Sequence, residues 1–327
     1  MNVKGLILCS LLLAPAPCRA QEGREPAEEV TPGEVVRVDT DLVPVEVTVR
    51  DAAGQVVRGL RRIDFRLFED GVERPISFFS AETTGGTLPC PLDLVFALDV
   101  SGSMTREEMW MLREASALFA ERLSGPRTRF AVISFGMNVR VLQPLTGDAR
   151  RLGKAFDSAL RDETGLSTHV FDAVDDAVRM LARRGRKTPG GLGVKRVVVV
   201  VSDGFPTGDT VSPPTVIERA NAAVVTVYTV TMPSYGYGAM RGRPVPTILD
   251  VSGLAAQTGG VNVYATDRNY AEALKAVSTE VLSRYILAFY PDREKRPDGN
   301  FHHLSVQVPG GMTVSLSRRG YAGKGAR

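Results

Sequence analysis

The sequence predicts an α/β fold, in which a doubly wound, mostly parallel sheet is inserted between flanking β-strand segments that form a small β-sandwich. Between residues 91 and 284, short apolar runs alternate with helical patterns, as is typical of strands joined by crossover helices. Residues 197–201 are all valine, which predicts a central strand buried on both faces. Segments 36–87 and 285–321 alternate with a period of two. A β segment on each side of one α/β domain favours pairing of the two segments.

The first 20 residues have the pattern of a cleaved signal peptide. Lys4 precedes an apolar run at 6–13 that is too short to span a bilayer, and small residues follow before Gln21. We therefore expect an exported protein that is periplasmic, secreted or on the cell surface. Residues 21–35 are rich in Glu, Pro and Gly and predict a flexible leader. No later apolar run reaches about 18 residues, so no transmembrane span is predicted.

Cysteine content and charge narrow the class of protein further. Cys9 and Cys18 lie in the segment expected to be cleaved, which leaves Cys90 and predicts no intrachain disulfide. We expect Cys90 to be a buried thiol near the start of a strand. The net charge is +3, and Lys4 and Arg19 leave with the signal peptide. The mature chain is then close to neutral, so no nucleic-acid partner is expected.

The strands and helices of the α/β part are predicted from local sequence patterns, namely apolar runs and helix-capping residues. The strand at 92–98 is followed by Thr105 and Glu108, which have the spacing of a helix capping box. Asp148 predicts the cap of a helix over 149–162. The other elements are expected as strands at 130–135, 139–142, 224–230 and 261–265 and as helices that begin at Thr168, span about 248–257 and span about 269–283.

The flanking segments predict strands from alternation and turn residues. In the first segment, residues 42–50 alternate apolar and polar side chains, and a turn at 51–54 follows. The other flanking strands are expected at 65–71, 75–80, 285–290, 303–308 and 314–317.

A group of oxygen-bearing side chains follows the strand at 92–98. Asp99, Ser101 and Ser103 come directly after it, at the carboxyl edge of the predicted sheet, where ligands bind in such folds. The turn offers a carboxylate and hydroxyls but no base or thiol, so its chemistry is oxygen ligation of a hard cation. The alternative is a helix cap, because short Asp/Ser turns are common at helix starts.

This Asp-x-Ser-x-Ser pattern resembles the metal-ion-dependent adhesion site of von Willebrand factor A (VWA) domains. Thr168, ahead of a helix, matches the distant threonine of the family, and Asp203, after the valine run, matches its second aspartate. The resemblance implies a divalent cation held by Ser101, Ser103 and Thr168, with Asp99 and Asp203 bound directly or through water. It implies Mg²⁺, with Mn²⁺ or Ca²⁺ as alternatives, and an open position for an Asp or Glu of a protein partner. Both aspartates are expected at the rim of the domain.

The flanking segments add to this resemblance. The sequences Glu69-Asp70-Gly71 and Arg318-Arg319-Gly320-Tyr321 look like the flanks of a group of exported bacterial proteins related to VWA domains. The likeness then covers most of the mature chain. This likeness supports the predicted architecture more than it indicates the biological role of the protein.

The residues and the resemblance favour a protein-binding module for adhesion or interaction over an enzyme. The sequence has no Gly-x-Ser-x-Gly elbow, His-Glu-x-x-His motif or phosphate-binding loop, and we predict no catalytic residue. A metal-assisted hydrolase is the rival, since a metal with an open position activates water. It lacks a positioned base, because His169 is expected to be a polar residue at the rim and His302 and His303 to lie in a hairpin. A structural envelope protein with an unused site is the third alternative.

Segment 232–244 is rich in glycine and unusually aromatic for a linker. In a parallel sheet it would leave the same carboxyl edge as the predicted metal site. The alternative is an ordinary connection. Asp209, in the loop after the valine run, is a second-choice metal ligand, and the favoured interpretation is an acid in a surface turn. The candidate partner-binding residues are of the types that anchor interfaces, namely Tyr235, Tyr237, Arg241 and Arg243.

Overall fold

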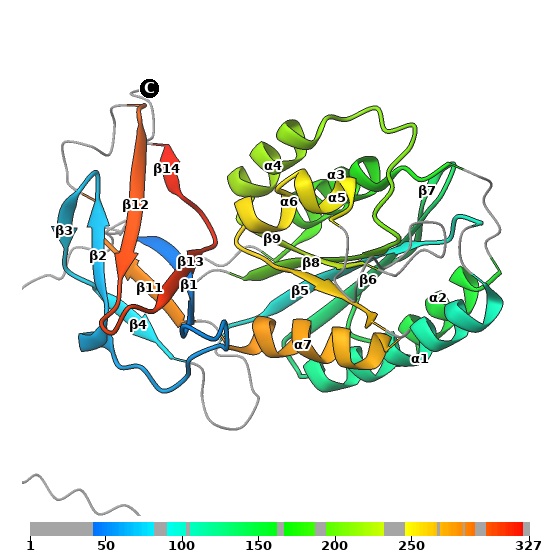
Figure 1. Ribbon diagram of the computed structural model, residues 1–327, viewed down its shortest axis with the longest axis horizontal. Helices are drawn as coiled ribbons and strands as arrows, with labels where there is room; N and C mark the ends of the chain where they lie inside the picture. Colours follow the sequence, from blue (N-terminus) through cyan, green and yellow to red (C-terminus); the bar gives the residue numbers. More distant parts are fainter. Residues whose placement is uncertain are drawn as a thin grey trace, which may run out of the picture. The chain divides into compact units, whose positions relative to one another are not determined.

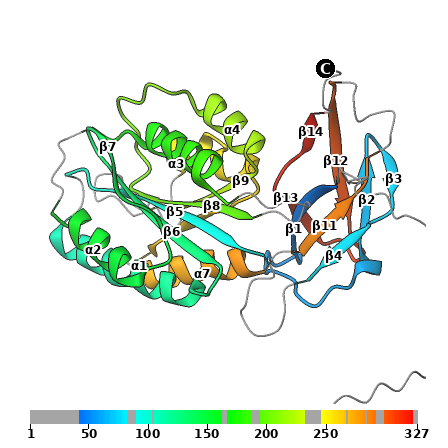
Figure 2. The same cartoon turned by 180° about the vertical axis from the view of Figure 1, so that it is seen from behind.

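The computed structural model describes residues 42–81, 90–102, 105–161, 167–186, 194–231, 246–266, 269–283, 285–291 and 299–322. These residues confirm the predicted fold class. One six-stranded sheet, mostly parallel, carries helices on its faces, and two further four-stranded sheets are built from the flanking segments (Figures 1 and 2).

The six-stranded sheet has the order β10-β9-β8-β5-β6-β7. All neighbouring pairs are parallel except β6 and β7, which are antiparallel. The central strands β5 and β8 are the continuous apolar runs of the sequence, because a strand covered on both faces has no polar side. The strands are β5 (Leu92–Asp99), β6 (Thr128–Phe135), β7 (Val139–Thr146), β8 (Lys195–Ser202), β9 (Val225–Thr231) and β10 (Asn262–Tyr264).

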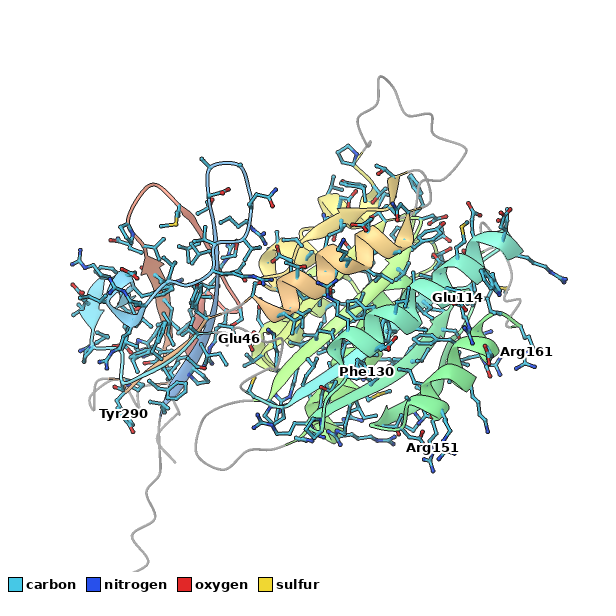
Figure 3. All side chains as sticks on the ribbon, turned by 90° about the horizontal axis from the view of Figure 1, so that it is seen from below. Glu46, Glu114, Phe130, Arg151, Arg161 and Tyr290 are labelled. Atoms are coloured by element: carbon cyan, nitrogen blue, oxygen red, sulfur yellow. The ribbon has the colours of Figure 1, made fainter. Side chains whose placement is uncertain are left out.

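Helices cover both faces of this sheet (Figures 1 and 2). Alternate residues of β5 point to opposite faces, so Phe96 packs with one layer of helices and Val95 with the other. Phe130 lies in the first of these cores, whereas Arg151 and Arg161 extend outward from the region of α2 (Figure 3). One layer holds α1 (Arg106–Leu123), α2 (Ala149–Ala159) and α7 (Tyr270–Leu282), and the other holds α3 (Val170–Arg184), α4 (Pro213–Ala222), α5 (Ile248–Val251) and α6 (Leu254–Gln257). Among the described helices, none combines the length and apolar character needed to cross a membrane.

The predicted helices are present with several shifted boundaries, and α4 is a helix that the sequence analysis did not predict. Thr105 and Glu108 form the predicted capping box of α1, and Asp148 caps α2 by accepting from the Arg150 backbone N–H. The helix expected to begin at Thr168 begins at Val170. The helix expected over about 248–257 is two short helices, because Gly253 has φ 75° and interrupts the helical path.

The flanking segments pair with each other to form two antiparallel sheets, with the orders β13-β1-β11-β4 and β14-β12-β2-β3. Val45 of β1 lies opposite Leu287 of β11, which joins the residues before the α/β part to those after it. Both sheets contribute to one apolar core, which includes Val45 of the first sheet and Leu67 of the second. The elements are β1 (Val43–Arg50), the 3₁₀ helix η1 (Arg62–Asp64), β2 (Arg66–Glu69), β3 (Val72–Arg74), β4 (Phe78–Ser80), β11 (Tyr285–Phe289), β12 (Phe301–Gln307), β13 (Thr313–Leu316) and β14 (Gly320–Ala322).

Cys90 lies two residues before β5 and is a buried free thiol, as predicted. Burial raises the pKa of this thiol above its usual value. Because the thiolate is the reactive form, Cys90 is suited to packing and not to chemistry.

Candidate metal centre

Asp99 is the last residue of β5 and lies beside Ser202, the last residue of β8, because the parallel register places Leu98 opposite Val201. Both oxygens of the Asp99 carboxylate accept hydrogen bonds. Oδ1 accepts from the Ser101 backbone N–H at 2.9 Å, and Oδ2 accepts from the Ser202 hydroxyl at 2.7 Å. Asp99 has an exposed fraction of 0%. The expectation of a position at the rim is therefore wrong for Asp99, because the ends of both central strands lie inside the domain.

The electrostatics of Asp99 favour a bound cation. Burial raises the pKa of this carboxyl to about 6, against the opposing hydrogen bonds from Ser101 and Ser202, and the negative charge of Asp203 raises it further. Within the described residues, neither aspartate forms an ion pair with Arg or Lys. A buried carboxylate without a basic partner is costly when ionised. A divalent cation would supply the missing positive charge, so these residues fit a metal ion.

Thr168 is held from two sides at the same edge of the sheet. Its backbone pairs with Thr207, with Thr168 N donating to Thr207 O at 3.2 Å and Thr207 N donating to Thr168 O at 2.9 Å. The next residue, His169, donates its backbone N–H to the carbonyl of Gly136, which follows β6. Thr168 is only 5% exposed, yet its hydroxyl makes no hydrogen bond in the part of the chain that the structure describes. This hydroxyl is therefore available as a metal ligand.

Asp203 begins the loop that follows β8. It is partly exposed, and its Oδ1 accepts from the Phe205 backbone N–H at 3.1 Å. The hydroxyl of Ser202 accepts from the Gly204 backbone N–H at 3.1 Å while it donates to Asp99. Ser202 thus joins Asp99 to the turn that contains Asp203, and its bond to Asp99 was not predicted from the sequence. In the sequence, the only feature that pointed to Ser202 was its position directly before Asp203.

Gly204 is required at this turn for two reasons. It has φ 85°, and a Cβ atom added there would lie 2.4 Å from Thr247 Oγ1. Thr247 is itself the cap of α5, where it forms a capping box with Asp250. The substitution Gly204→Ala is expected to lower the free energy of unfolding by about 2–4 kcal/mol, since it combines a strained backbone with displacement of this cap.

The measurement for Gly204→Ala is urea denaturation beside Gly54→Ala. Gly54 has φ 79° but nothing within 4 Å of an added Cβ, so this control carries the backbone cost alone, about 1 kcal/mol. Equal losses in the two variants would contradict the role assigned to Thr247.

A second group of side chains lies at the start of α3. Metal-ligating atoms of His169, Asp172 and Asp209 are all within 4.8 Å of one another. His169 Nδ1 lies 3.0 Å from Asp172 Oδ2, and the Asp172 backbone N–H donates to Asp209 Oδ1 at 2.9 Å. Asp209 therefore caps α3, whose N-cap residue His169 makes no side-chain capping hydrogen bond. It is partly buried, and burial raises the pKa of its carboxyl, so the interpretation as an acid in a surface turn is incomplete.

Asp172 ties the first turn of α3 to the loop that carries Thr207. Its Oδ1 accepts from the Thr210 backbone N–H and hydroxyl, both at 3.0 Å, and from the Val211 backbone N–H at 2.9 Å. Burial raises the pKa of this carboxyl, but the hydrogen bonds from His169, Thr210 and Val211 outweigh it, and the pKa lies below its usual value. Asp172 thus helps to hold Thr168 in place.

Four of the residues predicted as metal ligands lie on neighbouring segments, and their role as ligands stays a prediction. Asp99, Ser101, Thr168 and Asp203 lie on segments that hydrogen bonds join at the carboxyl edge of the sheet. Ser103 lies outside the described residues. So do the candidate partner-binding residues Tyr235, Tyr237, Arg241 and Arg243, which stay a prediction.

The model of the von Willebrand factor type A domain matches residues 93–280. The chain belongs to this family. The matched residues include the strands and loops that hold Asp99, Thr168 and Asp203. VWA domains mediate protein interactions and typically bind a divalent metal ion at the metal-ion-dependent adhesion site (MIDAS).

A human protein, inter-alpha-trypsin inhibitor heavy chain H4, is 26% identical over 182 residues, which are 55% of this chain and 19% of that protein. The chain therefore spans about a fifth of the length of this curated relative. Among solved structures, BatB from Bacteroides thetaiotaomicron is 19% identical, with 58% of this chain and 97% of that chain covered and a TM-score of 0.42. Proximal thread matrix protein 1 from the mussel byssus, solved with a zinc-occupied MIDAS motif, is 17% identical, with 61% and 47% covered and a TM-score of 0.46.

Proposed function

We propose that the chain is an exported protein-binding module that captures an Asp or Glu of a partner protein through a divalent cation. The cation, Mg²⁺ or alternatively Mn²⁺ or Ca²⁺, is held by Asp99, Ser101, Ser103, Thr168 and Asp203. The supporting observation is the buried carboxylate of Asp99, which has no basic partner among the described residues and whose pKa burial raises to about 6.

The donor set explains why a partner carboxylate would bind. Mg²⁺ takes about six oxygen ligands, so five groups from the chain leave a position open. Three of the five groups are neutral hydroxyls, and a cation held largely by hydroxyls keeps a high affinity for a further anionic oxygen. A carboxylate of a partner protein supplies that oxygen. The chain's own residues would orient the ion and exclude other contacts.

We further propose that the domain spans 91–284, with segments 36–87 and 285–321 forming one β unit that supports it. The pairing of β1 with both β11 and β13 supports this division. The β unit then holds the two ends of the α/β domain close together, because the chain enters the domain after β4 and leaves it before β11.

The first test is isothermal titration of the mature chain with Mg²⁺ and with Mn²⁺. Saturable binding to one site is expected, with loss of that binding in Asp203→Asn. Asp203 is preferred because it is partly exposed, so the variant is expected to fold. The matched control is Asp176→Asn in α3, which removes an exposed carboxylate that makes no hydrogen bond within the described residues. An unchanged isotherm in Asp203→Asn would contradict the proposed ligand set.

The partner's contribution needs a separate measurement. The mature chain is passed over immobilised peptides that differ in one position, glutamate or glutamine, with Mg²⁺ present or with EDTA. Retention is expected for glutamate with Mg²⁺ and not for the other three combinations. Retention that persists in EDTA, or that does not distinguish glutamate from glutamine, would refute carboxylate capture through the metal.

A further inference from the structure

Thr247 supports the turn of Asp203 from outside the group of predicted metal ligands. A Cβ atom added at Gly204 would lie 2.4 Å from Thr247 Oγ1, so the Thr247 side chain packs directly on the backbone of Gly204. The Gly204 carbonyl also accepts from the Leu249 backbone N–H at 3.2 Å. Gly204 follows Asp203 in the chain, and its own N–H donates to the Ser202 hydroxyl. A shift of Thr247 would therefore displace the turn that carries Asp203.

The helix α5, which begins after Thr247, is too short to hold this position alone. It has four residues, and a single helical turn is unstable in water without outside contacts. Leu249 anchors the helix in the apolar core, with an exposed fraction of 1%. The cap of the helix depends on Asp250, whose Oδ2 accepts from the Thr247 backbone N–H at 2.7 Å and from its hydroxyl at 2.9 Å. Both bonds lie within one turn, so they fix the shape of the cap but not its place in the domain.

Tyr264 connects this cap to the sheet. Tyr264 is the last residue of β10 and lies opposite Thr231, at the end of β9. Its hydroxyl donates to Asp250 Oδ2 at 2.9 Å. The other carboxylate oxygen, Oδ1, is buried and makes no hydrogen bond within the described residues. Burial and the bond to Asp250 raise the pKa of Tyr264 to about 12, so the phenol remains a donor throughout the neutral range.

We propose that Tyr264 and Asp250 are positioning residues of the candidate metal centre, which act through Thr247 on the turn of Asp203. This role rests on the proposed function, because it concerns the same site. Without the Tyr264 hydroxyl, Asp250 keeps only its two donors from Thr247, and its carboxylate turns toward water to recover the lost bond. Thr247 then moves with Asp250, and Gly204 loses the contact that holds it. Asp203 is less ordered before the cation binds, which lowers the affinity.

The test compares Tyr264→Phe with the wild type by amide hydrogen exchange in EDTA, followed by NMR. The variant keeps the ring and removes only the hydroxyl. The backbone N–H groups of Gly204 and Phe205 report on the turn, because they donate to Ser202 Oγ and Asp203 Oδ1. Exchange at these two amides is expected to be about tenfold faster in the variant, because the turn opens locally more often.

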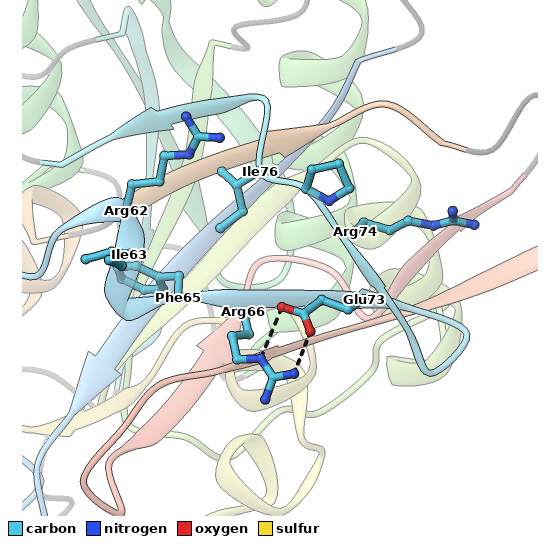
Figure 4. Close-up of a pocket in the computed structure, with 8 residues that line it drawn as sticks. Arg62, Ile63, Phe65, Arg66, Glu73, Arg74 and Ile76 are labelled. Atoms are coloured by element: carbon cyan, nitrogen blue, oxygen red, sulfur yellow. Dashed lines mark hydrogen bonds and ion pairs between the residues drawn. The ribbon is translucent and has the colours of Figure 1, made fainter.

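The control is Tyr285→Phe, which removes a buried phenol hydroxyl from the β unit. The Tyr285 hydroxyl donates to the Val57 carbonyl at 3.0 Å, and its ring lies 4.9 Å from that of Phe65, which lines the groove in Figure 4. None of these residues belongs to the candidate metal centre. Exchange in every variant is expressed relative to Val199, in the buried centre of β8, which reports on global unfolding. On this scale, the Gly204 amide of Tyr285→Phe is expected to match the wild type.

Titration with Mg²⁺ then measures the effect on the cation. The Kd of Tyr264→Phe is expected to rise about fivefold, and that of Tyr285→Phe to stay unchanged. Unchanged relative exchange at Gly204 in Tyr264→Phe would overturn the proposal, and so would faster exchange with an unchanged Kd. Equal increases in Kd in the two variants would also overturn it, because lost stability would then explain both. A wild type that binds no Mg²⁺ refutes the proposed function instead, and exchange in EDTA still decides whether Tyr264 holds the turn.

Discussion

Asp99→Asn is expected to make the metal-free protein more stable at about pH 7.5 and to abolish binding of the divalent cation. The folded state raises the pKa of Asp99 from 3.8 to about 6, chiefly through burial. The folded chain therefore binds this proton more tightly than the unfolded chain, and the free energy of unfolding falls as pH rises through this window. Above it, the ionised carboxylate costs on the order of 3 kcal/mol.

Asparagine carries no charge, so the variant does not have this cost. Its side chain cannot accept both of the hydrogen bonds that the carboxylate accepts, and this offsets about 1 kcal/mol of the gain in stability. The net gain of about 2 kcal/mol corresponds to a rise in Tm of several degrees for a domain of this size. The gain should shrink towards pH 4, where the wild-type carboxyl is protonated in the folded state. With Mg²⁺ present, the wild type is expected to become more stable than the variant, because only the wild type is stabilised by bound ligand. The difference grows with the occupancy of the cation site.

Calorimetric unfolding of both proteins in EDTA and in Mg²⁺, at about pH 7.5 and pH 4.5, checks this result. Asp176→Asn serves as the control for loss of an exposed carboxylate; burial and the charge of Asp175 raise the pKa of Asp176 as well, so the gain measured for this variant is subtracted. A variant that is less stable than the wild type in EDTA at the higher pH would show that the hydrogen bonds of Asp99 outweigh its burial.

The second large effect is expected from Asp172→Ala. This change removes the acceptor for Thr210 and Val211 and the partner of His169. The free energy of unfolding is expected to fall by about 3 kcal/mol, because hydrogen bonds to a charged group are stronger than neutral ones and several are lost together. Metal affinity should fall about tenfold, since the segment of Thr168 is then held to the loop of Thr207 by fewer contacts.

Urea unfolding and metal titration of Asp172→Ala, beside Asp176→Ala on the same helix, separate the two effects. The stabilising contribution of Asp172 is present above the pKa of the unfolded chain and is lost as pH falls through the lowered folded pKa. The variant should therefore lose its disadvantage in strong acid. A large loss of stability with unchanged metal affinity would make Asp172 a structural cap that does not position Thr168.

Local patterns predicted most of the α/β part because its strands and helices carry strong signals. The valine run lies at the centre of the sheet, and Thr105 and Glu108 form the expected cap. The sequence analysis missed the helix α4. It also missed β3 and β14, which have three residues each and are too short to show a period. Such strands form because a neighbouring strand supplies their hydrogen bonds. The predicted limits of the signal peptide at 1–20 and of the leader at 21–35 fall outside the described residues and stay predictions.

The fold class and the chemical character of the candidate metal centre could be predicted from the residues alone, because periodicity and ligand type are local properties of the chain. It could not show that Asp99 is wholly buried, that Ser202 donates to it, or that Asp172 and Asp209 hold the start of α3. These points depend on contacts between segments that lie far apart in the chain. Ser202 lies 103 positions from Asp99, and Thr210 lies 38 positions from Asp172. Burial and hydrogen bonds over such separations depend on how the strands align, and no local pattern encodes that alignment.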